Sequence, residues 1–370
     1  MPSPSPPHVS AVLLNWNNWQ DTLRCLHSLL SSAYPALTII VCDNGSSDDS
    51  LAYIRKWAEG RMKTPESSDP DFESFFQDAV TPITYREVST GPDAKGPTGP
   101  VIAPLILVRI QENIGYARGN NVGLRLSLAN QSDYILLLNN DIVVNADSVS
   151  RLVAFAEDHP DAALLAPRLF EPDPRTGVYK EASPLNWRRR PSFWDFTIFA
   201  GLTARARERS DTADWAGGLR GWQGRLYYAP GCALMFRANT LRQAGLFDER
   251  TFLYYEEYIL AERLRTLGLR TYWVPDASVW HRKGATTRRM ADASRYANLL
   301  LSEMYYLAAH RRLDRAQLLF IRLQRTLGFW RRMAVDKSFR SGYAEFARRY
   351  WGSRYPTPYT RGVRSCYGKD

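Results

Sequence analysis

The sequence has few cysteines and no long apolar run. Four cysteines occur in 370 residues, and none of them forms a CxxC pair. Neither a disulfide framework nor a zinc ribbon is therefore indicated, and we expect free thiols. No stretch approaches the ~18 uncharged apolar residues that a membrane-spanning helix needs. The sequence therefore predicts no transmembrane helix.

The first seven residues lack the basic and apolar regions of a secretory signal. They are rich in proline and serine, which predicts a cytoplasmic protein. A content of 45% hydrophobic and 23% charged residues excludes a wholly disordered chain. At about 150 residues per domain, the length fits two or three units, or one large α/β domain with an appendage.

Most of the chain lacks an excess of positive charge, which is confined to the last sixty residues. Residues 311–370 hold 15 Lys or Arg against 4 Asp or Glu, a net charge of +11, whereas residues 1–310 hold 33 against 34. A nucleic-acid enzyme more often spreads basic residues along its substrate groove. The distribution instead favours attachment to a surface through a basic tail, without nucleic acid as a partner.

Short apolar runs alternate with sequence of helical spacing. Residues 9–14, 37–41, 105–110 and 134–138 are such runs, each followed by polar residues and then a helical pattern. This alternation predicts an α/β fold with a mainly parallel central sheet and helices on both faces. Ligands of such sheets bind beyond the carboxyl ends of the strands, where Asn15 and Asp43 are expected.

The α/β pattern lapses once and ends in helical sequence. Residues 58–104 contain seven prolines and four glycines without sustained periodicity, and they predict a long surface insertion. Residues 291–350 have long helical sequence. We expect a catalytic domain over residues 1–310 and a basic amphipathic helical tail over residues 311–370.

One apolar strand ends abruptly in polar residues. Tyr134 to Leu138 is followed by Asn139, Asn140 and Asp141. A carboxylate held there fits a hard divalent ion whose other ligands are water and phosphate oxygens. The alternative is that Asp141 caps the next helix. A second segment, Asn113 to Asn121, joins a strand to a helix through two glycines and three asparagines, which suits close contact with a ligand.

Together these segments resemble the family 2 glycosyltransferases, which have the GT-A fold. The resemblance covers residues 8–310. Within the family, the sequence is similar to the bacterial rhamnosyltransferase-like members. Four blocks carry it: Leu14-Asn15-Trp16-Asn17 with Asp43-Asn44-Gly45-Ser46-Ser47-Asp48; Asn113 to Asn121; Leu138 to Asp141; and Pro230-Gly231-Cys232 with Phe247-Asp248-Glu249 through Glu256-Glu257.

The resemblance implies a nucleotide-binding part at residues 8–170 and an acceptor-side part at residues 171–310. Asp43 would recognise the nucleotide base. The other residues implied at the nucleotide-sugar site are Asn15, Asn113, Gly115, Asn120, Asn140 and Gly231. The implied activity is that of an inverting, metal-dependent hexosyltransferase, which uses dTDP-rhamnose or a UDP-sugar. Its acceptor would be a glycan or lipid-linked hydroxyl in bacterial surface polysaccharide synthesis.

The resemblance also implies a metal site and a catalytic base. Asp141 matches the last position of the metal-binding DxD motif, and Asn139 stands at its usually acidic first position. His281 matches a metal-binding histidine, and Mg²⁺ or Mn²⁺ would be the cofactor. Glu256-Glu257 matches an acidic pair whose second member, Glu257, would be the base. A structural histidine and a glutamate pair that complements a helix dipole are the alternatives.

The basic tail and the overall function each leave an alternative open. The tail interleaves leucines and aromatics with arginines, which predicts peripheral contact with the inner face of the cytoplasmic membrane; the alternative is a helix packed on the catalytic domain. A nucleotidyltransferase of similar fold would carry a basic Gly-rich loop where this chain has Asn15-Trp16-Asn17. A non-catalytic polysaccharide- or nucleic-acid-binding protein would not need Asp43, Asp141 and Glu257.

Overall fold

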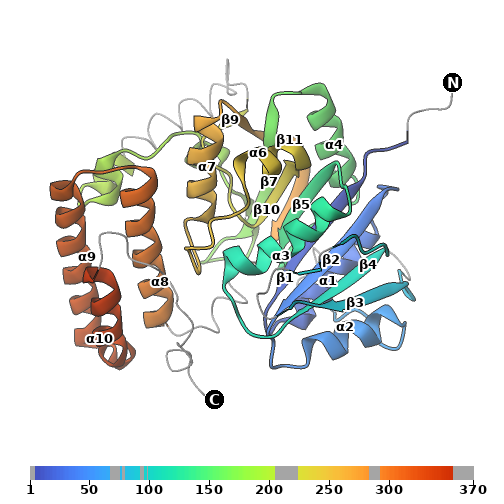
Figure 1. The fold of residues 1–370 in the computed structure, drawn as a ribbon, viewed down its shortest axis with the longest axis horizontal. Helices are drawn as coiled ribbons and strands as arrows, with labels where there is room; N and C mark the ends of the chain where they lie inside the picture. The colour runs from blue at the N-terminus through green and yellow to red at the C-terminus, as the bar shows by residue number, and fades with distance from the viewer. Residues whose placement is uncertain are drawn as a thin grey trace.

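A computed structural model describes residues 5–66, 76, 80–91, 96–97, 99–204, 224–282 and 292–352. Its centre is a single 11-stranded sheet, which helices flank (Figure 1). The main strand order is β3-β4-β2-β1-β5-β10-β7-β11-β6, with β8 paired to β7 and β9 paired to β11. The α/β architecture predicted from the sequence is confirmed, as is the helical extension after it.

Four of the strands follow the apolar runs of the sequence closely, whereas the short strands β6, β8 and β9 were not expected from the sequence. The strand bounds are β1 Val9–Asn15, β2 Leu37–Asn44, β3 Tyr85–Ser89, β4 Leu105–Ile110, β5 Tyr134–Asn139, β6 Ile142–Val144, β7 Ala162–Pro172, β8 Tyr179–Glu181, β9 Arg225–Leu226, β10 Ala233–Arg237 and β11 Arg270–His281. The register of β11 with β7 shifts between Val274 and Ser278.

The helices fall between the strands and then fill the end of the chain. The α-helices are α1 Trp19–Leu30, α2 Ser50–Ala58, α3 Tyr116–Ala129, α4 Ser148–Asp158, α6 Ala238–Ala244, α7 Glu256–Thr266, α8 Asp292–Tyr305, α9 Arg315–Val335 and α10 Lys337–Trp351. Short 3-10 helices are η2 Pro184–Trp187 and η3 Phe193–Phe196, and a π-helical turn, η5 Tyr306–His310, extends α8.

Strands β3, β4, β2, β1 and β5 form the parallel half of the sheet. The chain crosses from β1 to β2 in one direction and from β4 to β5 in the other. Because such crossovers are right-handed, α1 and α3 lie on opposite faces of the sheet. The connections on the two sides of β1 therefore lie on opposite faces of the sheet. Such a switch point leaves a crevice beyond the carboxyl end of β1, where ligands of these sheets bind.

The other half of the sheet is mixed. Strand β10 pairs antiparallel with both β5 and β7, while β11 pairs parallel with β7 and antiparallel with β6. The predicted insertion at residues 58–104 contributes the edge strand β3, which pairs parallel with β4. This strand was missed because its residues are only partly buried, so their pattern is not that of a core strand.

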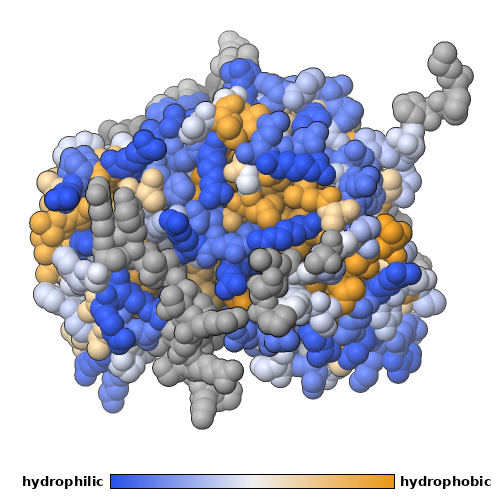
Figure 2. Space-filling view, in the orientation of Figure 1, coloured by the Kyte–Doolittle hydropathy of each residue, from blue (hydrophilic) through white to orange (hydrophobic). Residues whose placement is uncertain are grey.

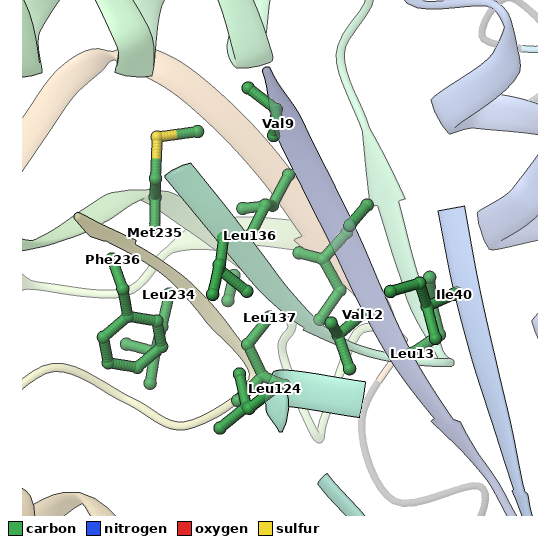
Figure 3. Packing of buried hydrophobic residues seen from close by; sticks show 14 of the residues in the cluster. Val9, Val12, Leu13, Ile40, Leu124, Leu136, Leu137, Leu234, Met235 and Phe236 are labelled. Atoms are coloured by element: carbon green, nitrogen blue, oxygen red, sulfur yellow. The ribbon is translucent and has the colours of Figure 1, made fainter. Parts of the chain in front are cut away.

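The main hydrophobic core lies between the sheet and its helices. Val12, Leu137 and Phe236 belong to β1, β5 and β10, and all three side chains are fully buried. Figure 3 shows them close to Leu124 of α3. Gly123 of the same helix sits so near the sheet that a Cβ atom there would come 2.4 Å from Val12 Cγ1. This contact fixes the height of α3 above β1.

A second hydrophobic cluster holds the C-terminal helices together. It joins buried residues of α8, α9 and α10, including Leu301, Ile321 and Phe346, with Ile259 of the sheet-covering helix α7. One face of α9 therefore packs inward, as in the alternative considered for the tail. Its other face leaves large apolar side chains half exposed: Leu319, Phe320, Leu323, Leu327 and Trp330. Figure 2 shows apolar surface on the flank where α9 lies in Figure 1.

A search of the described helices finds none with the length and apolar character that crossing a membrane requires.

Candidate active site

The carboxyl ends of β1 and β2 meet in a buried polar network. Asn15 and Asp43 are register partners, and Asn15 Nδ2 donates to Asp43 Oδ1 over 2.7 Å. Ser46 Oγ donates to the same oxygen over 2.5 Å. Burial raises the pKa of Asp43, while these hydrogen bonds oppose the shift. The network fixes the Asp43 carboxylate in one orientation at the strand end.

Asn140 extends this network from β5. Its Nδ2 donates to Asn15 Oδ1 over 3.3 Å and to Thr22 Oγ1 over 3.0 Å. Thr22 Oγ1 in turn lies 2.8 Å from Asn15 Oδ1. These polar groups are almost wholly buried, and buried polar groups need such partners. Asn140 therefore ties the polar end of β5 to β1 and α1.

A cavity of about 370 Å³ opens beside these strand ends. Of the residues predicted for the site, nine line it: Asn113, Gly115, Asn139, Asn140, Asp141, Gly231, Glu256, Glu257 and His281. The structure thus brings together predicted residues as far apart in the chain as Asn113 and His281, 168 positions. Asn15, Asp43 and Asn120 are outside the lining.

The loop from Asn113 to Tyr116 forms one wall. Asn44 Nδ2 donates to Asn113 Oδ1 over 3.0 Å, and the Tyr116 amide donates to the Phe252 carbonyl over 2.7 Å. Gly115 has φ +89°, and a Cβ atom there would come 2.7 Å from the Phe252 ring. Only glycine fits a backbone both left-handed and so closely packed. Gly115 therefore packs the loop from Asn113 to Tyr116 against the segment that precedes α7.

Asn120 belongs to α3, which begins at the end of this loop. Its Nδ2 donates to the Tyr116 carbonyl over 3.1 Å, and the residue is 1% exposed. Its Oδ1 has no hydrogen-bond partner among the described residues. In this structure the Asn120 side chain supports the first turn of α3.

Tyr116 connects the two halves of the cavity. Its hydroxyl lies 3.0 Å from Asn139 Oδ1 and 2.8 Å from the Gly231 carbonyl oxygen. The hydroxyl proton can serve only one acceptor at a time. Burial raises the Tyr116 pKa well above its ordinary value, and the charge of Glu257 adds to the shift. Tyr116 thus holds the Asn139 side chain toward the Gly231 loop.

Asp141, His281 and Glu171 form a row across another part of the cavity. His281 Nε2 lies 3.3 Å from Asp141 Oδ1, and its Nδ1 lies 3.1 Å from Glu171 Oε1. Burial alone lowers the pKa of His281, but the two carboxylates outweigh it and raise the pKa to about 9. Strand β11 brings the histidine here by pairing with β6 next to Asp141, where His281 opposes Ile142.

Whether a metal ion fits this row depends on the number of ligand atoms that the protein supplies. No described group of three or more His, Cys, Asp and Glu side chains has the arrangement to hold a metal by itself. Asp141 Oδ1 and His281 Nε2 nevertheless lie 3.3 Å apart, close enough for both to contact one ion. Two protein ligands suffice for an ion that keeps water and phosphate oxygens as its other ligands. The pair therefore fits an ion that arrives with a diphosphate.

Glu256 and Glu257 begin α7 but have different surroundings. Glu256 is 2% exposed; burial, reinforced by the charge of Glu257, raises its pKa to about 8. Glu257 is partly exposed to the cavity, and the Gly231 amide donates to its Oε1 over 3.4 Å. Burial raises the pKa of Glu257 as well. Of the two, Glu257 has the carboxylate better placed to meet a substrate.

Backbone strain precedes this glutamate pair. Tyr254 and Tyr255 have φ values of 75° and 70°, a region that bulky side chains rarely adopt. Such residues cost about 1–3 kcal/mol each and persist only where the surroundings impose them. Tyr255 is the N-cap of α7. The strained turn thus sets the direction in which Glu256 and Glu257 leave the loop.

Several lining residues were missed by the sequence analysis, among them Tyr116, Glu171 and Tyr254. Tyr116 stands within the segment whose glycines and asparagines indicate ligand contact, but an aromatic residue at the start of a helix is more often a packing residue. Glu171 follows the apolar run of β7 as Asp141 follows that of β5. That shared position at a strand end was the available signal.

Comparisons with known proteins agree with the motifs. Residues 10–74 match the family model "Glycosyl transferase family 2". A curated relative, N-acetylglucosaminyl-diphospho-decaprenol L-rhamnosyltransferase of Mycobacterium tuberculosis, is 28% identical over 170 residues, which are 42% of this chain and 49% of that protein. Low-salt glycan biosynthesis hexosyltransferase Agl10 of Haloferax volcanii is 25% identical over 154 residues, 41% of this chain and 44% of that protein.

The chain spans about half the length of the curated relatives it matches. Among solved structures, S. aureus TarS 1-349 in complex with UDP-GlcNAc is similar with a TM-score of 0.48 and 14% identity, over 94% of this chain and 82% of that one. The resemblance to family 2 glycosyltransferases, with rhamnosyltransferase-like members among them, is confirmed by the sequence matches.

Proposed function

We propose that this chain, which carries a glycosyl transferase family 2 segment at residues 10–74, is an inverting glycosyltransferase. It moves a sugar from a nucleoside diphosphate donor to a hydroxyl group of a glycan or lipid-linked acceptor. The observation that carries the proposal is that Asp141, His281 and Glu257 line one cavity of about 370 Å³. A site for a diphosphate and a base for a hydroxyl therefore share one space.

The base in this proposal is Glu257. Its carboxylate takes the proton of the acceptor hydroxyl, whose oxygen forms a bond to the anomeric carbon while the bond to the diphosphate breaks on the opposite side. The Gly231 amide contacts Glu257 Oε1, and a Cβ atom at Gly231 would lie only 3.2 Å from that oxygen. Gly231 keeps this approach open. The raised pKa of Glu257 makes the carboxylate a stronger base.

Asp141 and His281 are the residues that we assign to a divalent cation, Mg²⁺ or Mn²⁺. Such an ion screens the charge of the leaving diphosphate when bound. His281 Nε2 must be unprotonated to donate its lone pair. Asn139, at the first motif position, has its Oδ1 next to the Tyr116 hydroxyl, so we assign it to positioning the Gly231 loop as well as to the metal site.

The nucleotide side is assigned to residues 8–170 and the acceptor side to residues 171–310. Asp43 would contact the base, with Asn15 and Asn140 holding it in place and Asn113, Gly115 and Asn120 forming the adjacent wall. We propose dTDP-rhamnose or a UDP-sugar as donor. The mycobacterial relative is named for transfer of rhamnose to a diphospho-decaprenol acceptor, and an acceptor of that class, from bacterial surface polysaccharide synthesis, is our proposal here.

We further propose that the enzyme works at the inner face of the cytoplasmic membrane. The outer face of α9 presents Phe320, Leu323, Leu327 and Trp330, each about half exposed. Arg315 and Arg331 are exposed on the same helix. Apolar side chains beside arginines suit the interface of an anionic bilayer. The inner face of α9 belongs to the core, so the contact would be through one face of a packed helix.

A panel of nucleotide sugars tests the function. Thermal unfolding with and without Mn²⁺ identifies the donor as the compound that raises the melting temperature, and hydrolysis of that donor then shows catalysis. A nucleotidyltransferase would release pyrophosphate from a nucleoside triphosphate and a sugar phosphate instead. A non-catalytic binding protein would bind without turnover. Either of those outcomes would refute the glycosyltransferase proposal.

A further inference from the structure

A second cavity adjoins the candidate active site. Its volume is about 460 Å³, and it lies between α8, the end of α9 and the start of α10. Tyr254 lines this cavity and also the first one. The two spaces are therefore separated by the strained turn that leads into the glutamate pair.

Two arginines give the second cavity a positive character. Arg295 comes from α8 and Arg332 from α9. The Arg332 guanidinium stands 4.2 Å from the centre of the Tyr296 ring, which orients it. The Arg332 side chain is exposed near the end of α9. The carboxylate in the lining, Asp336, caps α10 by accepting a hydrogen bond from the Ser338 amide.

The charges of the two cavities both act on Tyr254. Burial raises the pKa of its hydroxyl, Arg295 lowers it and Glu256 raises it. Arg295 is thus near the wall that Tyr254 forms. A group bound by the arginines would lie next to that wall.

The remaining lining of the second cavity is largely apolar. Phe339 is buried at its base, and Val335 at the end of α9 is 85% exposed. Positive and apolar surfaces side by side suit a ligand with an anionic group joined to a hydrocarbon chain. A free nucleotide offers no such chain.

We propose that the second cavity binds the phosphate groups of an isoprenoid-linked acceptor, with Arg295 and Arg332 as their partners. This inference rests on the proposed function, because the sugar on those phosphates would reach past Tyr254 toward Glu257. Phosphate pairs strongly with guanidinium groups through charge-assisted hydrogen bonds. The hydrocarbon chain would leave over Val335.

The test is binding of farnesyl diphosphate, measured by calorimetry in the presence of EDTA. The double variant Arg295→Gln/Arg332→Gln should bind it at least about 10-fold more weakly than the wild type. Arg348→Gln, which alters an exposed arginine of α10 outside the lining, is the matched control and should stay within about 2-fold. Circular dichroism verifies folding, and Arg332→Gln alone replaces the double variant if that variant is unfolded.

Two further probes separate the sources of binding. Farnesol should bind weakly because it lacks phosphate, and inorganic pyrophosphate should bind weakly because it lacks the chain. Equal binding by the variants, or by farnesol, would overturn the phosphate assignment. Pyrophosphate binding as tight as that of farnesyl diphosphate would overturn the lipid assignment.

Failure of the proposed function is distinguishable from failure of this site. The binding assay needs no turnover, and the nucleotide-sugar panel does not involve the two arginines. Donor hydrolysis without arginine-dependent farnesyl diphosphate binding refutes the second site alone. If farnesyl diphosphate binding depends on the arginines but no nucleotide sugar serves as donor, the glycosyltransferase proposal is refuted and the phosphate-lipid site stands.

Discussion

The Tyr255 hydroxyl donates a hydrogen bond to Oε1 of Glu303 over 3.1 Å. Glu303 is held from its other side by Arg325, whose Nε and Nη2 contact its two carboxylate oxygens at 2.7 and 2.8 Å. Tyr255 is the left-handed residue directly before Glu256. Helices α8 and α9 therefore brace the turn that aims the glutamate pair.

Removing this brace should slow catalysis more than it weakens donor binding. We expect Tyr255→Phe to lose about 1 kcal/mol of stability, the contribution of one hydrogen bond, and to lower kcat several-fold with the donor KM unchanged. Glu345→Gln, which alters an ion pair with Arg349 within α10, is the control. A changed KM at constant kcat would show that the turn serves binding.

Replacing the proposed base should abolish transfer selectively. Glu257→Gln keeps the shape of the side chain but removes its basicity, so transfer should fall at least about 10²-fold while nucleotide binding persists. Radiolabelled sugar transfer and calorimetry measure the two properties. Near-normal turnover in this variant, with a large loss in Glu256→Gln, would move the role to Glu256.

The buried acid Glu256 should make stability depend on pH. Its pKa in the folded protein, about 8, is above the ordinary value of 4.5. Between these values the folded state binds more protons than the unfolded state, so stability falls as pH rises. Glu256→Gln does not titrate, so the melting temperature of this variant should rise relative to that of the wild type between about pH 5 and about pH 8. Parallel curves would contradict the raised pKa.

Metal dependence should require the Asp141 carboxylate. We expect Mn²⁺ to tighten nucleoside diphosphate binding in the wild type and to have no such effect in Asp141→Asn. Asp147→Asn alters an exposed carboxylate that pairs with Arg151 and is the control. Wild-type activity that survives a chelator would exclude the metal from the reaction.

The outer face of α9 should determine membrane binding. Leu323→Gln/Leu327→Gln should reduce cosedimentation with phosphatidylglycerol vesicles about tenfold at low salt, because two apolar side chains no longer enter the bilayer. Leu267→Gln, half exposed at the end of α7, is the control. Wild-type protein that ignores these vesicles would refute the assignment.

The sequence by itself determined the strands and the order of the motifs. Apolar runs such as Tyr134 to Leu138 are expected to form buried strands, and the polar residues directly after them are expected at the carboxyl ends of those strands. This local rule sufficed to predict Asp141 and Asn15 at strand ends. It missed β3 and β8, whose partly buried residues carry no such pattern, and it also missed the short strands β6 and β9.

Tertiary structure decided which side chains share a space. Asn15 and Asp43 stand at the carboxyl ends of strands, near the position that Asp141 has after β5, yet hydrogen bonds between them form a buried network outside the cavity. His281 reaches Asp141 because β11 pairs with β6. Tyr255 meets Glu303 only once the C-terminal helices pack on α7. These contacts join positions far apart in the chain, and their strength depends on burial and distance, which a linear pattern does not contain.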